Sequence, residues 1–362
     1  MPVTGTYGRM RVAITGATGN VGTALLRRLG SEDVDVVGIA RRRPHATPPY
    51  STVTWHQVDI ADHDAQKQLA PLFGGVDAVV HLAIGFQPMR DREYLRRTAV
   101  DGTAAVAKAA VEAGVPRLVH MSSSGVYSAG SYGQRVDENY SRNGIRRSTY
   151  SVDKAAAEFE LDAVEAESDI GVIRLRPGMI GQYAFGSAML RYALPDLVPS
   201  WVVDKVPVLP MDRSIVLPAV ATADVAEAIV SALSTEQRGA FNLSAPTPLR
   251  YDDFEETLGA RSVPVPWSAM RAAAAVSFTA RLQSVHPGWV DLAYGTPLVD
   301  TSRAERDLGW AATVDGPEVL AETIAGLRDN ASDGSETLRK RTAVDRVSSL
   351  LRRGPISRRP LP

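Results

Sequence analysis

The sequence predicts an α/β protein built on a doubly wound parallel sheet, with a smaller lobe formed by the C-terminal part of the chain. Two observations favour this class. In the first half of the chain, short runs that are apolar throughout alternate with helix-like runs, which is typical of a parallel sheet covered on both faces. The first apolar run ends in three regularly spaced glycines, Gly16, Gly19 and Gly22, and a helix-like run follows them.

The predicted strands and helices alternate along the first half of the chain. The strand-like runs are Val12–Thr15, Val34–Ala40, Val53–Val58, Ala78–Ala83, Leu118–Ser122 and Gly171–Leu175. The helix-like runs between them are Thr23–Leu29, Asp62–Leu72, Tyr94–Ala113 and Val152–Glu167. Because parallel strands need long crossover connections, strands separated by helices are expected to form a parallel sheet.

The pattern changes after Gln182, where prolines interrupt the chain often. Frequent proline indicates short elements and long loops. Within this part, Thr222–Leu233 predicts one more helix with Thr222 as its N-cap, and Gly239–Leu243 predicts one more strand.

The glycine-rich segment Arg11–Gly22, RVAITGATGNVG, predicts a phosphate site. Glycine lets the backbone turn sharply and lets a pyrophosphate approach without meeting a Cβ atom. The helix that follows offers unpaired N–H groups and the positive end of its dipole. We therefore expect a dinucleotide-binding domain of Rossmann type, whose turn includes Thr18, Asn20 and Val21. The alternative is an ordinary strand-to-helix turn.

Composition bounds the function of the chain. Its 362 residues are 44% hydrophobic and 22% charged, as in an ordinary soluble globular protein, and the net charge of −1 gives no reason to expect nucleic-acid binding. The absence of cysteine excludes disulfides and thiolate metal sites and fits a reducing compartment. The chain shows no apolar signal core, no membrane-spanning run and no metal-ligand spacing of histidines. We therefore expect a cytoplasmic protein with no membrane partner and no metal.

Three parts of the chain are expected. Residues 1–181 would form mainly the dinucleotide-binding domain, and residues 182–330 mainly a substrate-binding lobe, with 222–243 returning to the first domain. Residues 331–362 carry eight Lys or Arg against three acidic residues and little apolar periodicity. We expect them to form a basic, disordered tail.

Tyr150 and Lys154 lie four residues apart at the start of a helical run, so their side chains share one face of the helix. An ammonium beside a phenol favours the phenolate and lowers the phenol pKa from its usual value of about 10. Such a phenol can donate or accept a proton at neutral pH, as a carbonyl–alcohol interconversion requires. Taken alone, a Tyr and a Lys at this spacing are more often two surface residues on one helix. Whether they form a catalytic pair therefore depends on the residues around them.

That context is a strand ending in serines, Leu118–Ser124, which precedes the pair. In a doubly wound sheet, ligands bind at the carboxyl ends of the strands. A serine hydroxyl at that edge can hydrogen-bond a substrate oxygen while charge shifts onto it. For any single one of the three serines, a polar loop is the simpler interpretation.

The motifs TGATGNVG, SSSGVY and Tyr150-Ser-Val-Asp-Lys154 follow one another in this order. In this arrangement the chain resembles the extended short-chain dehydrogenase/reductase superfamily, in its NAD-dependent epimerase/dehydratase group, over about Met10–Arg328. The further motifs that carry the resemblance are VVHLA (Val79–Ala83), VDGT (Val100–Thr103), RLRPGMIG (Arg174–Gly181), TADVAEAI (Thr222–Ile229) and DLGW (Asp307–Trp310).

The resemblance implies that Tyr150 is the acid/base and that Lys154 lowers its pKa and bonds the nicotinamide ribose. It implies that Ser123 is the catalytic hydroxyl, because the family hydroxyl lies four residues before the tyrosine of an S-x-x-x-Y motif, here Tyr127. The nicotinamide supplies the hydride chemistry itself. The cofactor contacts implied are Asp59 and Ile60 at the adenine, Leu82 and Ala83 along the cofactor, and Pro177 near the nicotinamide.

The end of the second predicted strand indicates the type of cofactor. Ala40 stands where an NAD site usually carries an acidic residue for the ribose 2′-OH, and Arg41, Arg42 and Arg43 follow it. A carboxylate would repel a 2′-phosphate, whereas arginine can bind one with paired N–H groups. We therefore expect NADP(H), with Arg41 as the first contact and Arg42 as the next. NAD(H) with a solvated basic loop is the alternative.

Three departures from the family pattern narrow the expected substrate. Ala99 stands where family members often have Asn. Met179, which cannot donate a hydrogen bond, stands where sugar-nucleotide enzymes of the family often have a further Asn. Ser124-Gly125 follows Ser123, where dehydratases usually place Asp-Glu. These absences favour a reductase or dehydrogenase acting on a small, fairly apolar carbonyl or alcohol.

We therefore expect an NADP(H)-dependent oxidoreductase with a small-molecule substrate. The alternatives are a nucleotide-sugar 4-epimerase and a non-catalytic NADP-binding sensor. The resemblance also implies a homodimer that pairs through the helices Tyr94–Ala113 and Val152–Glu167.

Two histidines and four aromatic residues lie outside the motifs named above or have no role assigned by them. His81 and His120 lie in strand-like runs and are expected to be satisfied polar residues. The candidates for pocket lining, for each of which core packing is the simpler interpretation, are Trp201, Trp267, Phe278 and Trp289.

Overall fold

The structure, a computed structural model, describes residues 9–85, 91–193, 205, 207–283, 285–340 and 342. At its centre is a seven-stranded, fully parallel sheet in the order β12-β7-β5-β4-β1-β2-β3. The strand order runs outward in both directions from β1 and β4, which confirms the predicted doubly wound class. The strands are β1 (Met10–Thr15), β2 (Val34–Ala40), β3 (Thr54–Gln57), β4 (Ala78–His81), β5 (Arg117–Met121), β7 (Gly171–Pro177) and β12 (Gly239–Leu243).

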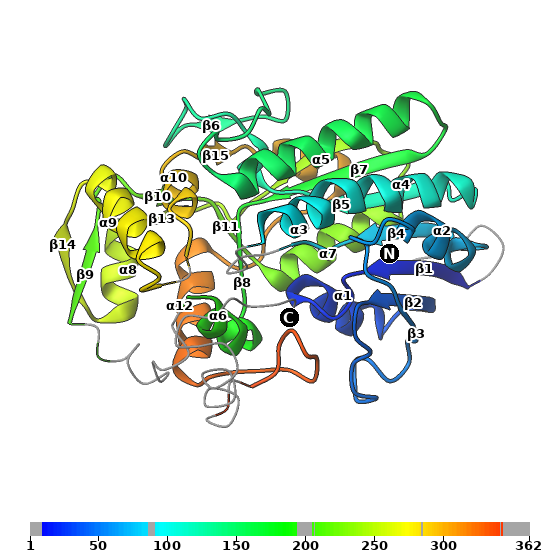
Figure 1. The fold of residues 1–362 in the computed structure, drawn as a ribbon, viewed down its shortest axis with the longest axis horizontal. Helices are drawn as coiled ribbons and strands as arrows, with labels where there is room; N and C mark the ends of the chain where they lie inside the picture. The colour runs from blue at the N-terminus through cyan, green and yellow to red at the C-terminus, as the bar shows by residue number, and fades with distance from the viewer. Residues whose placement is uncertain are drawn as a thin grey trace.

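Helices cover both faces of this sheet, with α4 and α5 above it and α1 below it in Figure 1. Successive strand residues point to opposite faces, so Val12 and Ile14 join one hydrophobic core and Ala13 joins the other. The helices of the first core are α1 (Asn20–Leu29), α7 (Thr222–Leu233) and α11 (Ser302–Leu308). Those of the second are α2 (Ala65–Leu69), α4 (Gly102–Glu112) and α5 (Thr149–Ala166), with the 3₁₀ turn Ala70–Phe73.

The smaller lobe lies on the left of Figure 1 and consists of short elements. Its helices are α8 (Tyr251–Leu258), α9 (Trp267–Thr279) and α10 (Gly288–Ala293), and α6 (Gly186–Ala193) and α12 (Gly316–Arg328) lie between it and the sheet. Four two-stranded pairs complete the described structure: β8 (Met179–Gly181) with β11 (Ala219–Ala221), β9 (Val208–Met211) with β14 (Arg261–Pro264), β10 (Val216–Leu217) with β13 (Leu249–Arg250), and β6 (Arg135–Val136) with β15 (Leu298–Val299).

Two expectations about helices are wrong in detail. The single helix expected over Tyr94–Ala113 is divided into α3 (Arg92–Arg96), a π-helical segment (Arg97–Asp101) and α4. Thr222 is not the N-cap of α7: Ala221 holds that position, and the Thr222 hydroxyl instead donates to the carbonyl of Gly181 at 3.0 Å.

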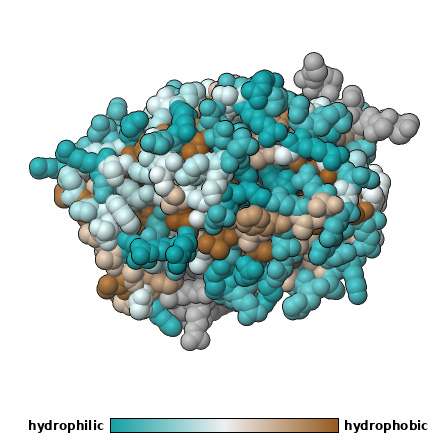
Figure 2. Space-filling model, turned by 90° about the horizontal axis from the view of Figure 1, so that it is seen from above, coloured by the Kyte–Doolittle hydropathy of each residue, from teal (hydrophilic) through white to brown (hydrophobic). Residues whose placement is uncertain are grey.

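The face formed by α4 and α5 is the one for which a homodimer was expected. Val111 on α4 and Phe159 on α5 are exposed there. Figure 2, which views the molecule from this side, shows a mostly hydrophilic surface with separate apolar patches near its centre. The homodimer stays a prediction.

The expectation of a disordered tail is wrong for residues 331–340, which we call the C-terminal strap. The strap leaves α12 and runs toward α1, as the orange segment near the centre of Figure 1 shows. Ser335 and Leu338 are 1% and 0% exposed, so the strap is packed against the protein. Its polar sequence lacks the apolar periodicity that predicts packing. Apart from Thr342, the rest of the expected tail lies outside the described residues.

None of the helices in the part of the chain that the structure describes is both long and apolar enough to cross a membrane.

The DLGW and TADVAEAI motifs meet in the structure, around the buried carboxylate of Asp224. It accepts hydrogen bonds from the Thr313 hydroxyl at 2.6 Å and the Thr313 and Val314 amides at 3.0 and 3.3 Å, while Trp310 Nε1 donates to the Asp224 carbonyl at 2.7 Å. This ties α7 to the segment after α11.

We expect Asp224→Ala to lower the free energy of unfolding by about 2 kcal/mol, because it leaves the Thr313 hydroxyl and the Thr313 and Val314 amides without their carboxylate acceptor. Glu227→Ala, at an exposed residue of the same helix that pairs with Arg28, should cost less than about 1 kcal/mol. Urea denaturation of both variants checks this. Equal effects would contradict a specific role for Asp224.

Candidate active site

The glycine-rich turn connects β1 to α1 and is shaped by two close backbone contacts. Gly16 has φ +72°, and a Cβ atom there would lie 2.6 Å from the amide nitrogen of Ala83. A Cβ atom at Gly22 would lie 2.5 Å from the carbonyl oxygen of Gly16. Side chains at either position would push the turn away from β4 or from α1. Both glycines are therefore required by the fold of the turn, and Leu82 and Ala83 lie directly beside it.

The N-terminus of α1 faces the turn with its amide groups uncapped by side chains of the described residues. Gly19 is the N-cap and has no side chain, and the first turn holds no acidic residue. The positive end of the helix dipole is thus available to an anion. These features fit a pyrophosphate, so the turn could hold a dinucleotide.

The side chains of the turn have different roles. Asn20 is held from the small-lobe side, where Gln182 Nε2 donates to its carbonyl at 3.2 Å. Val21 packs into the first core, so only its backbone faces the turn. The carbonyl of Thr18 accepts a hydrogen bond from Ser335 of the strap at 2.8 Å.

Asp59, an expected adenine contact, and Arg41, the expected 2′-phosphate contact, belong to one hydrogen-bonded group. The Arg41 guanidinium donates to the hydroxyl of Tyr94 at 2.9 Å, and this hydroxyl donates to Asp59 at 2.8 Å. Ile60 is buried next to Gly102. Tyr94 was missed from the sequence, because only the chain path brings α3 to the ends of β2 and β3.

The side chains of Ser123 and Tyr150 lie near each other at the carboxyl end of β5. Ser123 lies two residues after β5, and Tyr150 lies in the first turn of α5, which Ser148 caps. Both side chains lie against Gly125, because a Cβ atom there would lie 3.2 Å from Ser123 Oγ and 3.5 Å from a ring carbon of Tyr150, and Ser123 Oγ accepts the Gly125 amide at 3.0 Å. The neighbouring Ser122 and Ser124 are buried, and Ser122 donates to Glu158 instead. Pro177, expected near the nicotinamide, ends β7 at this same edge of the sheet.

The expected electrostatic effect of Lys154 on Tyr150 is not what this structure shows. Desolvation raises the pKa of Tyr150, and only the neighbouring Ser123 hydroxyl opposes this effect. The Lys154 ammonium donates to the Met121 carbonyl at 2.6 Å, and burial lowers its own pKa to about 8. Its charge instead contributes to lowering the pKa values of His81 and His120. The spacing placed the two groups on one helix face but could not give the direction of the Lys154 side chain.

A buried ion pair lies one helical turn beyond Lys154, and the sequence did not reveal it. Glu158, which is 0% exposed, accepts two hydrogen bonds from Arg176 of β7 at 2.6 and 2.9 Å and one from Ser122 at 2.5 Å. Arg176 also donates to the Tyr127 hydroxyl at 3.0 Å. These contacts lower the pKa of Glu158 in spite of its burial. They connect α5 to the ends of β5 and β7.

The two buried histidines differ. His81 is satisfied as expected, because its ring nitrogens lie 2.6 Å from the Thr15 hydroxyl and 3.0 Å from the Thr103 hydroxyl. His120 is not, because neither of its ring nitrogens has a hydrogen-bond partner among the described residues. Thr103 in turn donates to the carbonyl of Ala99, where the π-helical segment replaces a regular helical turn.

Apolar side chains from the smaller lobe lie against Tyr150 and Gly125. The rings of Trp289 and Tyr150 are 5.1 Å apart and inclined by 31°. The side chain of Leu292, one turn later on α10, lies 3.1 Å from where a Cβ atom of Gly125 would be. Trp289 is therefore the candidate aromatic residue that reaches the site. Trp267 packs on Tyr294 and Phe278 on His286, while Trp201 lies outside the described residues.

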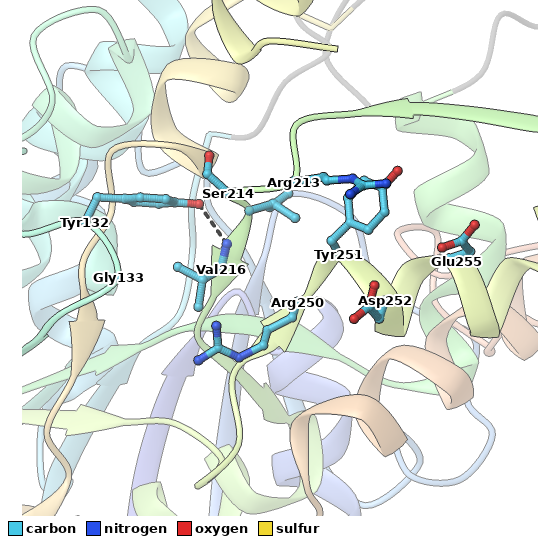
Figure 3. A pocket seen from close by; sticks show the side chains of 10 residues that line it. Tyr132, Gly133, Arg213, Ser214, Val216, Arg250, Tyr251, Asp252 and Glu255 are labelled. Carbon is cyan, nitrogen blue, oxygen red and sulfur yellow. Dashed lines mark hydrogen bonds between the residues drawn. The ribbon is translucent and has the colours of Figure 1, made fainter. Parts of the chain in front are cut away.

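A separate cavity of about 710 Å³ lies in the smaller lobe. Figure 3 shows Arg213 and Arg250 together with Asp252 and Glu255 around it, and none of its lining residues belongs to the predicted site. The described residues contain no cluster of three or more His, Asp or Glu that could hold a metal ion.

Comparison with known proteins identifies the family. The family model described as NAD dependent epimerase/dehydratase family matches residues 12–244. The chain belongs to this family. The match contains both the glycine-rich turn and the Ser123–Tyr150 pair, so the site lies within the region that family members share.

Curated relatives match parts of the chain. An uncharacterized protein of Mycobacterium tuberculosis is 40% identical over 32% of this chain and 12% of its own length. L-arabinose 1-dehydrogenase (NAD(P)(+)) of Haloferax volcanii is 36% identical over 32% of this chain and 42% of its own length. NAD-dependent glucose-6-phosphate dehydrogenase of the same organism is 28% identical over 48% of this chain and 69% of its own length. The first relatives are thus matched over only a small share of their length.

Solved structures share the fold over most of the chain. DesIV, a dTDP-glucose 4,6-dehydratase from Streptomyces venezuelae with NAD bound, has a TM-score of 0.67 at 22% identity and covers 91% of this chain and 100% of its own. A UDP-glucose 4-epimerase from Thermotoga maritima has a TM-score of 0.66 at 16% identity and covers 88% and 99%. At these identities the similarity establishes the fold.

The buried ammonium of Lys154 predicts a pH-dependent stability. Its pKa is about 8 in the folded protein against 10.5 for an unperturbed lysine, so between these values the unfolded chain binds more protons. The free energy of unfolding should therefore rise with pH in this window, by up to about 3 kcal/mol. Lys154→Met lacks this contribution.

We expect denaturation without added cofactor to show that the free energy of unfolding of the wild type increases relative to that of Lys154→Met between about pH 7.5 and about pH 10. Lys108→Met, at an exposed lysine of α4, should follow the wild type at every pH. A wild-type advantage that stays constant with pH would show that Lys154 is not desolvated.

Proposed function

We propose that this protein is an NADP(H)-dependent oxidoreductase that interconverts a small, fairly apolar carbonyl compound and its alcohol. The observation that carries the proposal is that Ser123 and Tyr150 lie against the same residue, Gly125, at the carboxyl end of β5, with Lys154 one turn along α5. A bound nicotinamide would supply or accept the hydride. The residues below would provide the geometry and the proton.

Tyr150 holds the proton that the carbonyl oxygen takes up on reduction. Its raised pKa keeps the phenol protonated at neutral pH, which suits a proton donor, and a nearby cation in the loaded site would ease the loss of that proton. Ser123 orients the substrate oxygen through its hydroxyl, while the Gly125 amide holds the Ser123 side chain. Lys154, kept at the strand end by its bond to Met121, is the group available to a ribose hydroxyl.

The proposed substrate class rests on the side chains around the catalytic pair. Trp289 and Leu292 are apolar and lie against Tyr150 and Gly125. Met179 stands where sugar-nucleotide enzymes of the family often have Asn, and it cannot donate a hydrogen bond to a sugar diphosphate. An apolar wall excludes water from a hydrophobic carbonyl compound and offers few partners to the many hydroxyls of a sugar.

The proposed preference for NADP(H) rests on the charge at the end of β2. Ala40 ends the strand without a carboxylate, and Arg41 and Arg42 follow it with exposed side chains. Arginine can bind a phosphate through two parallel N–H groups. Arg41 is already oriented by Tyr94.

The test of this function is turnover by the wild type and Tyr150→Phe with a panel of ketones, aldehydes and alcohols. The variant keeps the ring against Trp289 but loses the proton, so turnover should fall by at least about 100-fold while cofactor affinity stays within about twofold. Tyr140→Phe, away from the catalytic pair, is the matched control. Absorbance of the reduced nicotinamide measures the rate, and equilibrium titration measures the affinity.

Each other result points to a different function. Undiminished turnover in Tyr150→Phe would remove the mechanism. Purified protein that retains NAD without exchange and epimerises a sugar nucleotide would be the 4-epimerase of the first alternative. Cofactor binding without turnover of any compound would indicate the non-catalytic sensor.

The cofactor preference has its own prediction. Arg41→Gln should weaken NADP⁺ binding by about tenfold, because it removes a charge from the 2′-phosphate, and should change NAD⁺ binding by less than about twofold. Arg43→Gln is the matched control. Isothermal titration with both cofactors measures the four affinities. Equal losses for the two cofactors would place Arg41 away from the 2′-phosphate.

A further inference from the structure

The C-terminal strap is anchored to the rest of the protein at its beginning and near its end. The Ser187 amide at the start of α6 donates to the carbonyl of Ala331 at 2.7 Å. The guanidinium of Arg191, one turn later, donates to the carbonyls of Thr337 and Arg339. Leu338 is fully buried between these points. The strap is therefore a packed part of the fold.

Between its anchors the strap lies against the glycine-rich turn. The Ser335 hydroxyl, 1% exposed, donates to the carbonyl of Thr18 between Gly16 and Gly19 at 2.8 Å. Asp333 forms an ion pair with Arg27 of α1 and accepts a hydrogen bond from Tyr50 at 3.5 Å. The strap thus forms one side of the turn that would hold the pyrophosphate.

The next residue of the strap brings a carboxylate to the end of β2. A Glu336 carboxylate oxygen lies 3.7 Å from a guanidinium nitrogen of Arg42 and 3.5 Å from Nε of Arg339. Arg42 lies two residues after β2, whose end adjoins the turn because the Gly16 amide donates to the Ile39 carbonyl at 2.9 Å. An acidic residue is therefore present in this region, although the strand itself ends in Ala40.

We propose that Glu336 is a specificity-determining residue of the cofactor site, through which the C-terminal strap limits the preference for NADP(H) over NAD(H). The inference rests on the proposed function for the identity of the ligand. It goes beyond that function because it assigns the strap a role in cofactor choice that the β2 motif alone does not contain.

The direction of the effect follows from charge. A 2′-phosphate near Arg42 would meet the Glu336 carboxylate as a like charge and would compete with it for the guanidinium. A ribose 2′-OH carries no charge and can donate to a carboxylate. Glu336 therefore weakens the binding of NADP(H) and not that of NAD(H). Removing its charge should shift the preference toward NADP(H).

The experiment is equilibrium binding of NADP⁺ and NAD⁺ to the full chain, measured by isothermal titration without substrate. Glu336→Gln should raise the ratio of NADP⁺ to NAD⁺ affinity by about tenfold at low salt, and less at high salt because mobile ions screen the repulsion. Glu236→Gln, at a fully exposed glutamate on the loop before β12, is the matched control and should leave the ratio unchanged.

A second variant separates the charge from the presence of the strap. Ser335→Ala removes the bond to Thr18 and should weaken binding of both cofactors by a similar factor, which leaves the ratio near the wild-type value. Thermal unfolding of each variant verifies that the fold is intact. We expect an intact fold for Glu336→Gln, because the Glu336 side chain is 37% exposed.

An unchanged ratio in Glu336→Gln would overturn the inference, and so would a shift toward NAD⁺, since that would mean that Glu336 orients Arg42 for the phosphate. If the wild-type protein binds NAD⁺ more tightly than NADP⁺, the proposed cofactor preference is contradicted. The inference depends only on the change in the ratio on substitution, so the two failures are distinguishable.

Discussion

The buried pair of Glu158 and Arg176 is the constraint on which the site depends. The Glu158 carboxylate accepts hydrogen bonds from Arg176 of β7 and from Ser122, the residue after β5. Glu158 lies on α5, which carries Lys154 one turn earlier and Tyr150 two turns earlier. Burying two charges is costly, and the cost is offset only when every donor and acceptor is well placed. The pair therefore favours one register of α5 on the sheet, and this register brings Tyr150 to Ser123.

The sequence was a good guide where physical signals are local. Strands buried on both faces appear as continuous apolar runs, so β1, β2, β4, β5 and β7 could be located to within a few residues. The need for glycine at position 22 likewise follows from a contact within the turn, with the carbonyl oxygen of Gly16. The order of the motifs was sufficient to identify the family, because that order reflects the chain path through the sheet.

What the sequence could not give is the direction of side chains between distant segments. The spacing of Tyr150 and Lys154 says that they share a helix face, but the ammonium reaches the Met121 carbonyl on β5. Trp289 could not be distinguished from Trp267 by composition, and only the docking of α10 on α5 shows which of them packs on Tyr150. The strap was misjudged because it is held by hydrogen bonds and ion pairs, which leave no periodic pattern.

The contact between the strap and the glycine-rich turn has a consequence for the order in which the protein is made. Thr18 and Ser335 are 317 residues apart, so the turn leaves the ribosome long before its neighbour is synthesised. The sheet can assemble domain by domain as the chain emerges, whereas this contact can form only after the strap has also been synthesised. The glycine-rich turn thus gains its contact with the strap only after every strand of the central sheet has been made.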